Sequence, residues 1–232
     1  MPSISADPSA LFRLLGWLSP GFPVGAFAYS HGLEAAFERG DVSDRGSLVE
    51  WLEGLLRFGS ARCDAGLAAC AHRAVCDDDD AALCAVADFA AALFGAPELA
   101  RESFQQGDAF WKTIATSWPH PRLAAIAGSL PSGRLAYPVA VGAAAAAHGV
   151  PRDATCLAYL HAFVANGVSS AIRLGMLGQT DGQHVLRACE GTVVAAAESA
   201  CSAELASLGS ASLALDLFAL AHETQTTRLF RS

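Results

Sequence analysis

The sequence predicts an all-α protein, folded as a single domain of about ten helices over residues 1–232. Alanine and leucine are abundant, whereas valine, isoleucine and threonine are sparse, and this composition favours helices. Alternation of apolar and polar residues with a period of two, which is typical of strands, is nearly absent. Since 53% of the 232 residues are hydrophobic and 16% are charged, the chain can bury a sizeable core without disulfides or a structural metal.

Local start and stop signals place the first helices. Asp7 and the proline after it provide an N-cap and a first-turn proline for a short helix over residues 8–17. Glycines and prolines then punctuate a loop over residues 20–25. A second helix is expected over residues 30–39, with a serine at its start and with Gly40 ending it.

The middle of the chain predicts three longer helical stretches. Leucines and a tryptophan recur on one helical face after Ser43, so this helix is expected to continue past Gly59 to about Val75. A run of four aspartates favours the start of the next helix, over residues 77–94. Another helix is expected between Pro97 and Pro119, because proline begins helices well and interrupts them elsewhere.

Two uncharged runs, over residues 135–151 and 154–172, are predicted to be buried helices of a bundle rather than membrane spans. They contain proline, glycine and polar side chains, and polar groups are costly in hydrocarbon. Residues 153–174 carry apolar side chains on two sides, so this helix belongs in a core or an interface. Further helices are expected over residues 181–200 and 213–223, followed by a tail over residues 224–232.

Charge and cysteine usage exclude several classes of protein. The formal charge of -8 and the sequence pI near 5.3 oppose nucleic-acid binding, which requires clustered cations. The seven cysteines include no C-x-x-C pair, and several lie in apolar helical stretches, which indicates a reduced cytoplasmic compartment. No signal-peptide pattern stands at the N-terminus, so we expect neither secretion nor a membrane location.

Short catalytic and metal-binding motifs are missing from the sequence. The seven histidines are widely spaced, with no H-E-x-x-H, and no phosphate-binding loop or nucleophile elbow is present. Cys70, His72 and Cys76 are offset by two and six residues, which places them on different faces of one helix. We therefore expect no catalytic residues, no metal site and no cofactor. The alternative is an all-helical metal-dependent hydrolase or oxygenase whose histidine ligands are dispersed along the chain.

Two segments are candidates for binding partner proteins. Glycines and prolines fix an aromatic-rich loop against a helix start between residues 16 and 34. Near the other end, an apolar pair flanked by two arginines predicts a tail that docks on its own domain or on a partner. The candidate residues are Phe22, Pro23, Gly25, Phe27, Tyr29, Glu34, His222, Glu223, Gln225, Arg228, Leu229, Phe230 and Arg231.

A homodimer interface is expected on the helix over residues 154–172, because its apolar character exceeds what one core-facing stripe requires. Its polar members can set the register of the two copies, although buried roles within one chain are equally expected for them. The candidate residues are Leu157, Leu160, His161, Val164 and Asn166.

Blocks of residues along nearly the whole chain resemble the UreF family of urease accessory proteins, in the family's order. The weakest stretch of the resemblance lies between residues 61 and 131. The blocks are Ser19–Gly25, Ser30–Glu34, Tyr137–Gly142, Gly149–Pro151, Tyr159–Phe163, Asn166–Val168, Leu177–Gln183, His222–Gln225 and Arg228–Ser232.

The resemblance implies an all-α protein without catalysis of its own. Members of the family form homodimers and join the accessory protein UreD, also called UreH, and the GTPase UreG. The complex delivers nickel to the urease apoprotein and couples delivery to GTP hydrolysis. Two positions depart from the family's pattern, because Phe27 and His161 stand where a tyrosine can occur in relatives.

Overall fold

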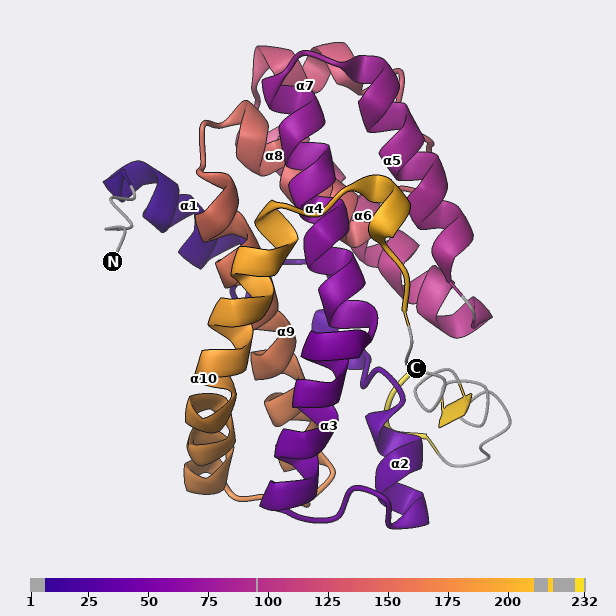
Figure 1. Ribbon diagram of the computed structural model, residues 1–232, viewed down its shortest axis with the longest axis vertical. Coiled ribbons are helices and arrows are strands. Elements are labelled where there is room, and N and C mark those ends of the chain that lie inside the picture. Colours follow the sequence, from indigo (N-terminus) through magenta and orange to yellow (C-terminus); the bar gives the residue numbers. More distant parts are fainter. Residues whose placement is uncertain (1–6, 95, 211–216, 219–227, 232) are drawn as a thin grey trace.

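The computed structural model describes residues 7–94, 96–210, 217–218 and 228–231, and this part of the chain is helical with no strand (Figure 1). The predicted all-α class is therefore confirmed. The elements are α1 (Pro8–Trp17), η1 (Ala26–Ala28), α2 (Leu33–Arg39), α3 (Arg45–Phe58), α4 (Ser60–Cys76), α5 (Asp80–Leu93), α6 (Pro97–Ser117), α7 (Pro121–Ile126), α8 (Tyr137–Ala147), α9 (Arg152–Arg173), α10 (Gln179–Cys201) and η2 (Leu205–Ser207).

The N-terminal helices follow their local signals closely. The Asp7 carboxylate accepts the backbone N–H of Ser9 at 3.3 Å, and α1 ends at Trp17 as expected. Helix α2 begins at Leu33, three residues later than predicted, because His31 and Gly32 have φ angles of 54° and 76°. A right-handed helix cannot include such angles.

Three expectations for the helices need correction or fall outside the described residues. The helix expected from Ser43 to Val75 is two helices, because Gly59 adopts φ -105° and ψ -157° between α3 and α4. Helix α7 was not predicted, since its six residues are too few to show a periodic pattern. The helix expected over residues 213–223 lies outside the described residues apart from 217 and 218.

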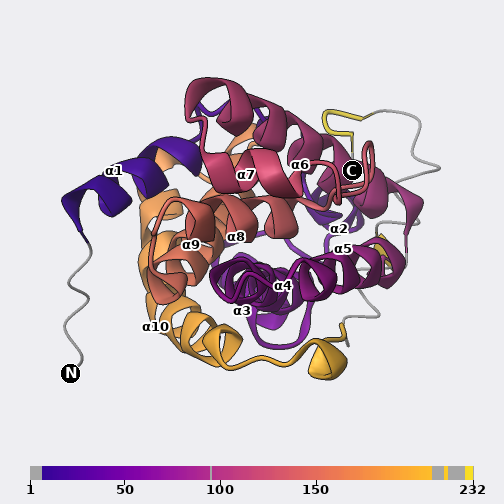
Figure 2. The same cartoon turned by 90° about the horizontal axis from the view of Figure 1, so that it is seen from above.

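The core is built around α4 and α8, which cross at the centre of the molecule (Figures 1 and 2). Eight of the eleven residues of α8 are buried, most of them alanine or valine. The two backbones approach closely where Gly142 of α8 meets Ala68 of α4. A Cβ atom at position 142 would collide with the carbonyl oxygen of Ala68. Small residues therefore allow this central contact.

Helices α9 and α10 lie side by side along one flank of this core (Figures 1 and 2). Helix α9 is long and apolar enough to cross a membrane by length and composition, and 56% of its most apolar window is buried inside the fold. The core helix of a soluble bundle meets the same test. Helix α1 covers the same flank, so the three helices surround one side of the molecule.

Candidate functional site

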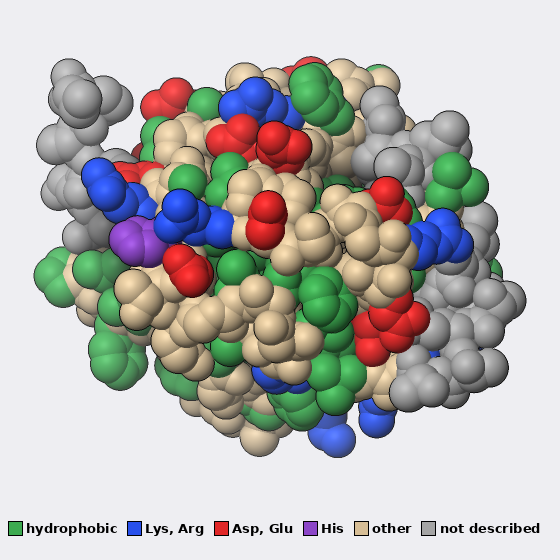
Figure 3. Space-filling model, turned by 90° about the horizontal axis from the view of Figure 1, so that it is seen from below, with side chains coloured by type: hydrophobic (Ala, Val, Ile, Leu, Met, Phe, Trp, Pro, Cys, Tyr) green, Lys and Arg blue, Asp and Glu red, His purple; other side chains and the backbone are tan. Residues whose placement is uncertain are grey.

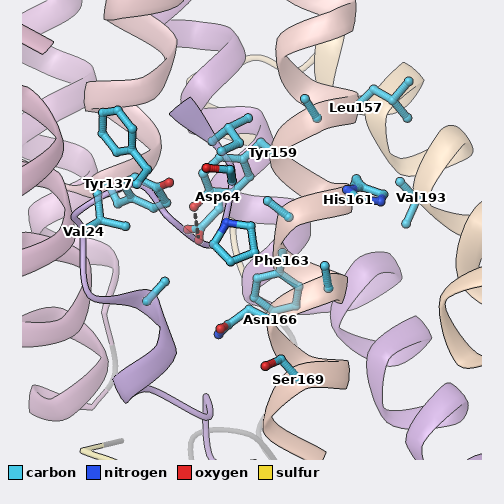
Figure 4. Close-up of a pocket in the computed structure, with 18 of the residues that line it drawn as sticks. Val24, Asp64, Tyr137, Leu157, Tyr159, His161, Phe163, Asn166, Ser169 and Val193 are labelled. Atoms are coloured by element: carbon cyan, nitrogen blue, oxygen red, sulfur yellow. Dashed lines mark hydrogen bonds between the residues drawn. The ribbon is translucent and has the colours of Figure 1, made fainter. Parts of the chain in front are cut away.

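A large cavity, with a volume of about 990 Å³, opens between α1, the loop before α2, α6, α9 and α10. Leu157 and His161 point from α9 toward Val193 of α10, whereas Tyr159 and Phe163 point to the other side of α9 (Figure 4). The cavity therefore borders α9 on two faces. Such size suits a segment of a partner protein or a ligand.

The rim of the cavity is apolar and exposed. Leu11 and Leu15 of α1 retain 50% and 67% of their accessible surface, and Phe27 of η1 retains 66%. Hydrophobic side chains protrude from the edge of the molecule at which α1 lies (Figure 3). Exposed apolar surface of this kind is typical of sites at which proteins associate.

The floor of the cavity is polar, although apolar helices surround it. The Tyr159 hydroxyl donates a hydrogen bond to Oδ2 of Asp64 at 3.0 Å (Figure 4). The rings of Tyr159 and Tyr137 lie 5.6 Å apart. Burial raises the pKa of Asp64 to about 7, the hydrogen bond from Tyr159 opposes this shift, and the negative charge of Glu102 adds to it.

The raised pKa of Asp64 predicts a loss of stability as pH increases. The folded state holds the proton that the unfolded chain releases near pH 4, so the free energy of unfolding should fall as pH rises from about 4 to 7. The Asp64→Asn variant should lack this fall. Its free energy of unfolding at pH 8 should exceed that of the wild type by about 1 to 3 kcal/mol. Urea denaturation at pH 5 and pH 8 measures both, with the exposed Asp88→Asn as control. Equal pH dependence in wild type and Asp64→Asn would contradict the assignment.

A second polar group forms the wall of the cavity nearest to α2. His31 Nε2 lies 3.2 Å from Oε1 of Glu102, which also accepts a hydrogen bond from Gln106 at 2.9 Å. The His31 ring packs against Phe163 with centroids 4.9 Å apart. These contacts hold His31 at its positive φ angle, which is uncommon for a residue other than glycine.

The residues predicted in the aromatic loop divide into buried and exposed groups. Phe22 is buried against Phe110, with ring centroids 5.3 Å apart, so it belongs to the core. Tyr29 is also buried, and its hydroxyl donates to Oε1 of Gln105 at 2.6 Å. Gly25 caps the start of η1 with a φ angle of 75°. Pro23 and Phe27 are the exposed members of the set.

The C-terminal tail contacts the same loop and α2. The buried Glu34 carboxylate accepts the backbone N–H groups of Leu229 and Phe230, at 2.6 and 3.0 Å. Backbone N–H of Arg231 donates to the carbonyl oxygen of Ala28 at 2.8 Å. The structure therefore brings together two predicted segments that are 195 residues apart.

Side chains of the tail anchor it further. Phe230 is 3% exposed and packs under the guanidinium of Arg173, which lies 4.2 Å from its ring centre. Arg228 pairs with Glu98 of α6 at 2.9 Å. Leu229 stays 59% exposed. Residues 228–231 thus dock on their own domain, while His222, Glu223 and Gln225 lie outside the described residues.

The candidate dimer residues of α9 also separate by burial. Leu160 and Val164 are fully buried in the core of their own chain, so in this fold they present no surface to a second copy. Leu157 and His161 face the cavity, and His161 is exposed. Asn166 lies on the other side of α9, near Phe163, and donates to the carbonyl oxygen of Tyr29 at 3.3 Å (Figure 4).

Several residues of the site were not singled out in the sequence. Asp64 is the one that a sequence signal could have indicated, because a carboxylate in an alanine-rich, buried helical stretch is unusual. Glu98, Glu102 and Arg173 gave no such signal, since their roles depend on segments distant in sequence. Within the described residues, no group of three or more His, Cys, Asp or Glu side chains could hold a metal ion.

Comparison with known proteins shows which family this sequence matches. A sequence model of the UreF family matches residues 42–190. The urease accessory protein UreF of Methylorubrum populi is 53% identical over 220 residues, covering 95% of this chain and 98% of that protein. Its counterpart from Rhodopseudomonas palustris strain BisB5 is 50% identical over 230 residues, covering 99% of this chain and 94% of that protein. This chain belongs to the UreF family of urease accessory proteins.

Proposed function

We propose that this chain is a non-catalytic adaptor of urease maturation. It bridges a UreD- or UreH-type accessory protein and a UreG-type GTPase in the cytoplasmic complex that inserts nickel into the urease apoprotein. The observation that carries the proposal is the exposed apolar rim of the cavity, formed by Leu11, Leu15 and Phe27. In a member of this family, an exposed apolar rim of this kind serves as a surface on which other proteins bind.

We assign two surfaces of this chain to two different binding partners. The first, which we call the α1 surface, comprises Leu11, Phe12 and Leu15 with Leu157 and His161 beside them, and we assign it to a second copy in a homodimer. Phe12 is 72% exposed, so its apolar ring gains most from being covered.

The second surface combines the loop and the tail, and we assign it to the accessory protein of UreD or UreH type. It consists of the exposed residues Pro23, Phe27, Leu229 and Arg231. Apolar anchors beside a guanidinium are residue types enriched in interface hot spots. The docked tail presents Leu229 in a fixed position, which reduces the entropy lost when a partner binds.

A deletion strain tests the proposal. Without this protein, urease subunits should be made but should contain little nickel when external nickel is limiting. Complementation with Leu15→Asp should restore less than about a tenth of the nickel content, because a charge on the α1 surface removes about 1.5 to 3 kcal/mol of burial and must be desolvated. Metal analysis of purified urease measures the result.

Phe58→Asp is the matched control, because Phe58 is 63% exposed on α3 and does not line the cavity. It should complement as well as the wild type. Normal urease nickel in the deletion strain would overturn the function. Full complementation by Leu15→Asp would leave the function standing and overturn the assignment of the α1 surface.

A further inference from the structure

A histidine and a cysteine lie together at the end of α4, away from the cavity and from the two surfaces described above. His72 and Cys76 are one helical turn apart, so they share a face of the helix. The Cys76 sulfur lies 3.6 Å from Nδ1 of His72. Cys70 does not join them, because its sulfur donates to the carbonyl oxygen of Ala203 at 3.5 Å.

A hydrogen bond on the other side of the His72 ring determines which nitrogen carries the proton. His72 Nε2 lies 2.7 Å from the carbonyl oxygen of Val150, in the loop between α8 and α9. A carbonyl oxygen only accepts hydrogen bonds, so Nε2 is the protonated nitrogen. Burial lowers the pKa of His72, which favours the neutral ring. In the neutral ring, the lone pair of Nδ1 points toward the Cys76 sulfur.

The separation of these two atoms matches that of two ligands on one metal ion. Zinc lies about 2.3 Å from a thiolate sulfur and about 2.0 to 2.1 Å from an imidazole nitrogen, and tetrahedral geometry then separates the two ligand atoms by about 3.5 to 3.6 Å. The observed separation is 3.6 Å. Histidines that bind metals usually donate their other N–H to a carbonyl or a carboxylate, as His72 does to Val150.

Access and charge at the end of α4 also suit a cation. Cys76 is exposed and His72 is 7% exposed, so an ion can enter from the side of the sulfur. Burial of the sulfur and the negative charge of Asp77 raise the pKa of the Cys76 thiol, with a smaller contribution from Asp78, and Arg152 opposes the shift. Negative charges that disfavour the thiolate attract a cation, and a thiol that binds a metal loses its proton.

We propose that His72 and Cys76 form a two-ligand binding site for a borderline-soft divalent cation of the zinc type. Nδ1 of His72 and the Cys76 sulfur bind the ion, the Val150 carbonyl holds the His72 ring, and water occupies the remaining positions. Binding releases the Cys76 proton to solvent, and no electron is transferred. Imidazole and thiolate ligands favour such ions over magnesium or calcium, which prefer oxygen ligands. Structural zinc sites have four protein ligands, so two ligands predict an exchangeable ion.

Cobalt(II) is the probe, because it replaces zinc and its bond to a thiolate absorbs in the near ultraviolet. Titration of the reduced, metal-free full chain should produce this band, and zinc should remove it. Cys76→Ser should lack the band, and His72→Gln should need at least about ten times more cobalt for half-saturation. Cys84→Ser and His184→Gln are the matched controls and should behave as the wild type. The Cys84 sulfur donates to the carbonyl oxygen of Ser129, and His184 is exposed on α10.

A second measurement uses the wild-type chain alone and so does not depend on how a variant folds. Excess zinc should slow alkylation of Cys76 by iodoacetamide at least about tenfold, because a bound thiolate is shielded, and should leave alkylation of Cys84 unchanged. Mass spectrometry of the two peptides measures both rates, and magnesium should change neither.

A thiol that only donates a hydrogen bond to Nδ1 of His72 accounts for the same distance of 3.6 Å. In that case zinc would not protect Cys76, and the proposal would be overturned. The proposal is equally wrong if the wild type gives no cobalt–thiolate band, if the band persists in Cys76→Ser, or if a folded His72→Gln variant keeps the wild-type affinity for cobalt.

Discussion

Replacing Gly142 by alanine should lower the free energy of unfolding by about 3 kcal/mol or more, although it adds a single methyl group. The new Cβ atom would collide with the backbone carbonyl of Ala68, and a backbone cannot move aside as a flexible side chain can. Helices α4 and α8 must then separate at the centre of the core. Since a domain of this kind is stable by only about 5 to 15 kcal/mol, the effect is large.

Urea denaturation compares this variant with Gly191→Ala. Gly191 lies on the exposed side of α10, and a Cβ atom there would meet nothing within 4 Å. The control should gain about 0.5 to 1 kcal/mol, because alanine favours helices more than glycine does. If both variants shift stability in the same direction and by the same amount, the close approach of α4 and α8 is wrong.

Replacing Glu34 by glutamine should release the tail from its own domain. A glutamine side chain offers one acceptor oxygen, and its amide group opposes the second backbone N–H, so one of the two bonds to Leu229 and Phe230 is lost. A hydrogen bond to a charged group contributes about 1.5 to 3 kcal/mol. Trypsin should therefore cleave after Arg228 at least about ten times faster in the variant.

Glu38→Gln provides the matched control, because Glu38 lies one turn further along α2 and is exposed. Its cleavage after Arg228 should match that of the wild type. An unchanged rate in Glu34→Gln would show that Phe230 and Arg228 hold the tail without the carboxylate. Binding of the proposed UreD-type partner by both variants would then separate the order of the tail from its role in docking.

Local chemistry made most of the helices predictable. Proline at position 8 or 97 and glycine at position 40 act within a few residues, so the starts of α1 and α6 and the end of α2 could be inferred without the fold. The break at Gly59 could not, because a single glycine within an apolar helical pattern is also tolerated inside helices. In the structure, Leu55 packs against Gly59, where the chain turns between α3 and α4.

The sequence predicted separate segments of the candidate site but not how they are arranged. The loop and the tail were identified as docking elements, but nothing in the sequence indicated that they contact each other. Leu160 and Val164 were predicted as interface residues because α9 carries apolar side chains on two faces. The sequence alone does not indicate which of these faces packs against its own chain. Only the packing of α9 against α4 and α10 decides which face remains available.

The bond between Glu34 and the tail also concerns the order in which the chain is made. Leu229 follows Glu34 by 195 residues. Most of the chain must therefore be synthesised before the Glu34 carboxylate can accept hydrogen bonds from the backbone N–H groups of Leu229 and Phe230. A nascent chain that has already folded α1 to α10 still has an incomplete loop over residues 25–34. Partners that recognise the loop together with the tail would therefore discriminate between chains that include residues 228–231 and shorter nascent chains.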